Sequence, residues 1–240
     1  MSDRLDPIRR AASGGQPGPG ADARERFRAG MRAGMAFVIP TLAIGISFGV
    51  LARSLGWGLA APIAASAFVY SASAQFAVAS VLGAGGSGVA AIVAAVLANA
   101  RFLPMGLAIA PALRGGRLRR ALEGQASVDT SWALANRGDG RFDREGLIGA
   151  TIPQYVAWLV GTVIGVVGSE AIGDPEALGL DALFPAFFLA LLVSEVDTPR
   201  ARVVVVLAAA LALALLPWAP PGVPVVAACV TALLGLRVTR

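Results

Sequence analysis

The sequence predicts an all-α fold, a polytopic membrane helical bundle of about six to seven transmembrane segments. Of its 240 residues, 56% are hydrophobic and only 15% are charged, whereas soluble domains carry roughly 25% charged residues. The mean hydropathy is +0.71, and apolar runs long enough to cross a bilayer recur along the chain. A surface of this composition suits lipid rather than water.

The N-terminal residues 1–28 differ from the rest of the chain. They are rich in glycine, proline, alanine and arginine and show little apolar periodicity, so we expect a disordered, arginine-rich cytoplasmic tail ahead of a transmembrane domain over residues 29–240. A signal peptide would place its apolar run much nearer Met1. The net charge of +5 comes from arginines in this tail and between apolar segments, a distribution typical of a plasma (inner) membrane protein and not of a nucleic-acid-binding one.

Seven apolar segments follow the tail. The first contains Pro40, Gly45 and Gly49, and the second is interrupted by a run of small and polar residues, Ser71–Gln75. We expect neither to form a straight helix. The predicted segments cover residues 31–52, 58–82, 89–110, 147–167, 180–196, 203–216 and 223–236.

The charges between these segments bear on topology. If every segment spans, the arginine-rich stretch 114–144 lies on the opposite side from the N-terminal tail, against the positive-inside rule. If residues 58–82 instead form a re-entrant pair of half-helices broken near Tyr70–Gln75, all arginine-rich loops lie inside. The alternative is a full span whose topology disobeys the charge rule, and the residues alone leave both open.

A glycine pattern occurs twice. Pro40 precedes Gly45-x-x-x-Gly49, and Pro153 precedes Gly161-x-x-x-Gly165. This indicates either an internal repeat of the kind found in transporters or close helix packing through small residues.

Polar residues inside apolar segments are the candidates for function, because an arginine at bilayer depth costs roughly 2.5–3.5 kcal/mol. Arg101 lies midway along the third segment, with Asn99 two positions before it. Arg101 is interpreted as an anchor for a substrate carboxylate or the counter-ion of an internal acid. The alternative is a structural pair with Asp129 or with a carbonyl at a helix end.

The run that begins at Ser71 is the second candidate region. A broken helix here would offer the positive end of its dipole to a carboxylate, with Gln75 as the best single contact. The alternative is a packed interface whose serines bond their own backbone. The substrate-binding candidates are Gln75, Arg101, Asn99, Ser71, Ser73, Pro40 (through a freed carbonyl) and Phe76, and Asp129 is the candidate proton carrier.

Enzyme signatures are missing from the sequence. There is no histidine and a single cysteine, Cys229, and we find no phosphate-binding loop, nucleophile elbow or metal-ligand cluster. We therefore expect no catalytic residue, no metal and no cofactor.

Several motifs occur in an order that resembles the AzlC family. They are Gly34, Pro40 and Gly45-Ile-Ser-Phe-Gly49, then Ser71–Phe76, Asn99-Ala-Arg101-Phe, Val128-Asp129, and Leu178-Gly-Leu-Asp181-Ala-Leu-Phe184-Pro-Ala-Phe. The resemblance runs in collinear order from about Arg28 to Leu192. Two positions depart from the family pattern: Thr130 follows the aspartate where the family tends to have an acid, and Ser73 stands where glycine is frequent.

The resemblance implies a permease, over residues 29–240, that exports leucine, isoleucine and valine, with methionine as a further candidate. It also implies a small membrane partner of the AzlD type and coupling to the proton motive force. A branched aliphatic zwitterion needs a carboxylate site, an ammonium site and an apolar pocket. The candidates for lining the apolar pocket are Phe48, Phe76 and Phe102. The alternatives are a transporter or channel for another small solute, and a scaffold subunit that does not transport.

Overall fold

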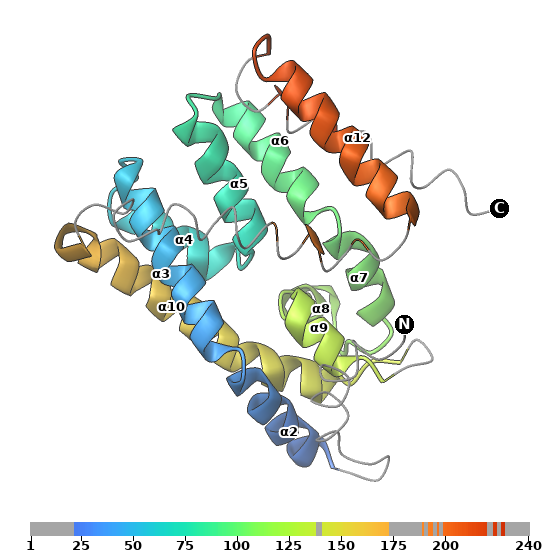
Figure 1. Cartoon of the computed structure of the whole chain (residues 1–240). Coiled ribbons are helices and arrows are strands. Elements are labelled where there is room, and N and C mark those ends of the chain that lie inside the picture. The colour runs from blue at the N-terminus through green and yellow to red at the C-terminus, as the bar shows by residue number, and fades with distance from the viewer. Residues whose placement is uncertain are drawn as a thin grey trace. The chain divides into compact units, whose positions relative to one another are not determined.

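The computed structural model describes residues 22–137, 141–172 and 199–219, together with residues 189, 192–193, 196, 223–224 and 227–228. This part of the chain is all-helical (Figure 1), which confirms the predicted fold class. The predicted segments 180–196 and 223–236 fall largely outside it. The helices are α2 (Ala23–Met35), α3 (Val38–Ser54), α4 (Ala60–Phe68), α5 (Ala72–Gly83), α6 (Gly88–Asn99), α7 (Phe102–Ile109), α8 (Arg117–Gly124), α9 (Asp129–Ala135), α10 (Arg144–Ile172) and α12 (Pro199–Leu215).

The chain divides into two compact units. The first unit comprises residues 1–46 and 101–161, and the second comprises residues 47–100 and 162–240. In the first unit, Ile109, Ala135 and Leu147 form a buried core cluster. In the second unit, α5 and α6 lie side by side (Figure 1) around Val81, Ala91 and Ala94.

The first helix begins inside the region predicted as tail. Asp22 precedes α2, and its carboxylate accepts a 2.7 Å hydrogen bond from the Glu25 backbone N–H. A short acidic side chain at this position satisfies one of the otherwise unpaired amides of a helix start. Helical structure therefore begins before the predicted boundary at residue 28, while residues 1–21 lie outside the described part.

One described helix is long and apolar enough to cross a membrane by itself. It covers Arg144–Ala171 in α10 and corresponds to the predicted segment 147–167. Two helix pairs, α2–α3 and α6–α7, pass the same test only if each bent pair is one span, which makes up to three spans in the described residues.

The bend in the first apolar segment does not lie at Pro40. The axes of α2 and α3 meet at 58°, at the break formed by Ala36 and Phe37. Pro40 instead occupies the first turn of α3, where a missing N–H costs little because that group has no partner within the helix.

The second apolar segment is broken at the predicted place. α4 has 9 residues and α5 has 12, and each is shorter than the roughly 20 residues that a transmembrane helix needs. The chain between them, residues 69–71, is not helical. The broken helix predicted near Tyr70–Gln75 is therefore confirmed.

Glycines bring α2 and α3 into backbone contact with α10. In the first unit, a methyl group added to Gly30 would overlap the Gly146 carbonyl, and one added to Gly161 would overlap the Leu42 carbonyl. In the second unit, a methyl group on Gly49 would overlap the Thr162 carbonyl. The packed pairs are Gly30 with Gly146, Gly34 with Ala150, Gly45 with Gly161, and Gly49 with Gly165.

These pairs show the direction and register of the helices. The partner numbers rise together, and every pair has the same separation along the chain, so α2–α3 and α10 run parallel and in register. The two predicted glycine motifs pack on each other, which favours the interpretation as a helix-packing interface.

If the bent α2–α3 pair is one span, it begins on the same side of a bilayer as the parallel α10, so an odd number of crossings must lie between them. The bent α6–α7 pair supplies one crossing if it is likewise one span. A second complete crossing by α4 and α5 would make the number even. The parallel packing therefore favours the re-entrant alternative for residues 58–82.

Candidate functional site

Gln75 closes the end of the broken helix in the second unit. Its amide nitrogen donates to the carbonyls of Ala65 (3.1 Å) and Val69 (2.8 Å), and its amide oxygen accepts from the Ser66 hydroxyl (3.4 Å). These two carbonyls also accept from the backbone N–H groups of Val69 and Ser71, so Gln75 adds a second donor to each. Gln75, which is 4% exposed, thus stabilises the break.

Two residues that sequence reasoning missed support this arrangement. The hydroxyls of Ser66 and Thr162 are 2.8 Å apart, and both side chains are fully buried. This hydrogen bond joins α4 to α10 inside the second unit. A serine within the apolar run of α4 was the available signal, but its partner is far away in the sequence.

The opposite side of the break carries a second polar group. The Ser71 hydroxyl donates to the Asn99 side-chain oxygen at 2.6 Å and lies 3.2 Å from the Ser73 hydroxyl. Ser71 also accepts a 3.4 Å hydrogen bond from the Ala74 N–H, which caps α5. The structure therefore brings three predicted residues together where α5 begins and α6 ends.

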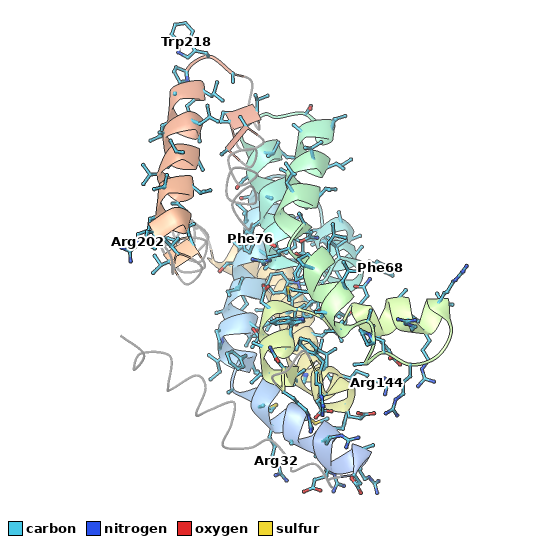
Figure 2. All side chains as sticks on the ribbon, turned by 90° about the vertical axis from the view of Figure 1, so that its right-hand side faces the viewer. Arg32, Phe68, Phe76, Arg144, Arg202 and Trp218 are labelled. Carbon is cyan, nitrogen blue, oxygen red and sulfur yellow. The ribbon has the colours of Figure 1, made fainter. Side chains whose placement is uncertain are left out.

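The candidate apolar residues divide between the units. Phe48 and Phe76 pack edge to face with their ring centres 5.6 Å apart, and both are buried in the second unit. Figure 2 shows Phe76 among packed side chains, and Phe68 at the end of α4 is 78% exposed. Phe102 belongs to the first unit.

In the first unit, Arg101 and Asp129 form an ion pair. The guanidinium and carboxylate are 2.8 Å apart, with the two side chains 31% and 46% exposed. Arg101 immediately precedes α7, and its guanidinium lies 5.3 Å from the Phe102 ring centre. The pair with Asp129 is the structural alternative that the sequence had left open.

Two features set the surroundings of Asp129. It begins α9, which is held against α7 by a 3.3 Å hydrogen bond from the Trp132 indole to the Met105 carbonyl. Burial raises the pKa of the Asp129 carboxyl above its ordinary value, while the Arg101 charge acts in the opposite direction.

Two further predictions concern Pro40 and metal binding. Pro40 is exposed in the first unit. In the part of the chain that the structure describes, no group of three or more His, Cys, Asp or Glu side chains is placed to hold a metal ion.

Comparison with known proteins identifies the family. A family model described as "AzlC protein" matches residues 36–172, which is more than half of the chain. The chain belongs to the AzlC family. The resemblance seen in its motifs is thereby confirmed, and membership of the AzlC family indicates a membrane protein with a role in transport.

Individual relatives are also named as membrane or transport proteins. The chain is 28% identical over 192 residues to the "Inner membrane protein YgaZ" of Escherichia coli K12, a match that covers 73% of this chain and 76% of the relative. It is 25% identical to the "Branched-chain amino acid transport protein AzlC" of Bacillus subtilis 168, with 72% and 70% of the two chains covered. An uncharacterised membrane protein of Helicobacter pylori 26695 is 23% identical, with 64% and 68% covered. No solved structure matches the chain.

Proposed function

We propose that this protein is the membrane permease subunit of an exporter of branched-chain amino acids, namely leucine, isoleucine and valine, with methionine as a further substrate. The name of the Bacillus subtilis relative supports the substrate class. The observation that carries the proposal is the partly exposed Arg101–Asp129 ion pair, because an amino acid carries the same two complementary charges.

In this proposal the substrate replaces the internal ion pair. Its carboxylate binds the Arg101 guanidinium, which presents a planar set of donors suited to a carboxylate, and its ammonium binds Asp129. The Phe102 ring beside the guanidinium contacts the branched side chain. When the zwitterion replaces the internal ion pair, Arg101 and Asp129 each gain a charge partner from the substrate, which limits the cost of charges in a membrane.

Proton coupling acts through the same carboxyl. Protonation of Asp129 removes the negative partner of both Arg101 and the substrate ammonium, so proton binding and substrate binding oppose each other. Entry of a proton from one side of the membrane would then favour release of the amino acid. The raised pKa of Asp129 supports this role.

The half-helix start at Ser71 is proposed as a separate polar contact within the second unit. Ser71, Ser73 and Asn99 hold hydroxyl and amide groups at the N-terminal end of α5, where the helix dipole favours a negative group. Gln75 is proposed to act indirectly. It stabilises the break between α4 and α5, since its amide hydrogens are donated to carbonyls at the end of α4.

A small AzlD-type membrane subunit is proposed as the partner. The test is leucine efflux from cells without exporters of their own, loaded with a leucine-containing dipeptide and expressing this chain alone or with its partner. We expect efflux only with the partner, and a protonophore should reduce it. Membrane expression of both subunits without efflux of any branched-chain amino acid would contradict the substrate assignment. Competition by unrelated small solutes would favour a transporter for another substrate.

A further inference from the structure

The α8 helix exposes an apolar face. Leu118 and Leu122 are 76% and 65% exposed, and residues four apart lie on the same side of a helix. No residue of α8 is buried. Within the first unit, to which α8 belongs, these two leucine side chains are therefore not covered by other residues.

The other face of α8 is tied to the protein. Glu123 accepts hydrogen bonds from the Arg144 guanidinium and from Arg119 at 2.9 Å, and its second oxygen accepts from the Arg114 backbone N–H at 3.3 Å. Arg144 begins α10, the one described helix that can span a membrane by itself, and Figure 2 labels it. At roughly 100° per residue, Glu123 points well away from the leucines. The hydrogen bonds between Glu123 and Arg144 therefore orient α8 so that its two leucines point away from the protein.

Arginines border this apolar face. Arg114, Arg117, Arg119 and Arg120 lie within residues 114–124, where Glu123 is the one acidic residue. The Arg114 and Arg119 side chains are 68% and 64% exposed. Arg119 and Arg144 both pair with Glu123, and α8 carries three arginines against this one acid, so the helix keeps a net positive charge.

We propose that α8 lies in the headgroup layer of the membrane and binds anionic lipids. Leu118 and Leu122 insert into the acyl boundary, and Arg117 and Arg119 contact the negatively charged headgroups. An exposed apolar face flanked by arginines is the pattern of a helix that lies in the interface, and basic residues next to spans favour anionic lipid. The Glu123–Arg144 tie fixes the position of α8 relative to the start of α10.

The experiment uses the full chain in nanodiscs. In a C229A background, an environment-sensitive fluorophore is attached at L118C. Nanodiscs of phosphatidylcholine alone are compared with nanodiscs that also contain phosphatidylglycerol. We expect a blue shift and protection from an aqueous quencher in the anionic discs, both weakened by about 1 M salt, which shortens the screening length to about 3 Å. R117Q/R119Q should remove the dependence on anionic lipid but leave α8 tied through Arg144.

A matched control is S87C, a probe in the exposed loop before α6, which has no arginine nearby in the sequence. Its emission should be the same in both lipids. The proposal is overturned if the Leu118 probe stays open to the quencher in anionic discs. It is also overturned if protection is equal in both lipids, or if R117Q/R119Q leaves the response to anionic lipid unchanged.

Discussion

The side-chain nitrogen of Gln75 lies 2.8 Å from the backbone oxygen of Val69, so a residue of α5 closes the end of α4. This relationship leads to the first prediction. Q75A should abolish leucine export, because the break between α4 and α5 loses the side-chain hydrogen bonds from Gln75 to the carbonyls of Ala65 and Val69. Each lost hydrogen bond costs about 0.5–1.5 kcal/mol, so the unfolding temperature in detergent should also fall. Q125A, at an exposed glutamine after α8, is the control and should export normally.

The Arg101–Asp129 pair gives a second prediction. R101A should abolish export while the protein stays in the membrane, because the proposed carboxylate contact is lost. D129N should lose exchange of leucine for leucine as well as export driven by a proton gradient, because its neutral side chain, like protonated Asp129, no longer binds the substrate ammonium. Efflux and counterflow in proteoliposomes measure both. Normal export by both R101A and Q75A would remove the proposed site.

Packing of α10 on α3 gives a third prediction. G161A places a methyl group against the Leu42 carbonyl, and overpacking of this kind typically costs about 1–3 kcal/mol. G106A is the matched control, because a methyl group at Gly106 meets nothing within 4 Å and alanine favours a helix. Thermal unfolding in detergent should show a lower midpoint for G161A and an unchanged or higher one for G106A. A neutral G161A would contradict the close packing.

The parallel course of α3 and α10 predicts the sidedness of the loop before α8. In a C229A background, G116C should be labelled by a membrane-impermeant maleimide from the same side as a cysteine in the N-terminal tail. The substitution is well tolerated sterically, since nothing lies within 4 Å of a side chain at Gly116. Labelling from the opposite side would mean that residues 58–82 make a full crossing.

Glu123 predicts a pH dependence of stability. Hydrogen bonding by Arg144 is the main cause that lowers the pKa of Glu123 from 4.5 to about 2. Because the folded-state pKa is depressed, this stabilisation is present above about pH 4.5 and is lost as the pH falls towards about 2. The unfolding temperature of the wild type should therefore fall more steeply over this range than that of E123Q. Equal slopes for the two proteins would contradict the assignment.

Much of the site was predictable because its signals are local. Small and polar residues in Ser71–Gln75 interrupt an apolar run, so a helix break was predicted there and is confirmed. Arg101 had to find a partner in a membrane, and Asp129 was among the predicted ones. The donors and acceptors at the break were not predictable, since Ser66 and Thr162 meet only after helices far apart in the sequence have packed.

The sequence by itself determined that this protein is an all-α membrane protein, because hydropathy and charge depend only on which residues are present and how they are spaced. It also determined the family, because its motifs follow the order of the family pattern and the family model matches residues 36–172. Only the tertiary structure decided that Gln75 serves the carbonyls of α4, that Gly45 meets Gly161, and that the bend lies at Ala36–Phe37 and not at Pro40. The physical reason is that these contacts depend on which helix faces meet and in which register, and sequence spacing within one helix carries no information about the helix packed against it.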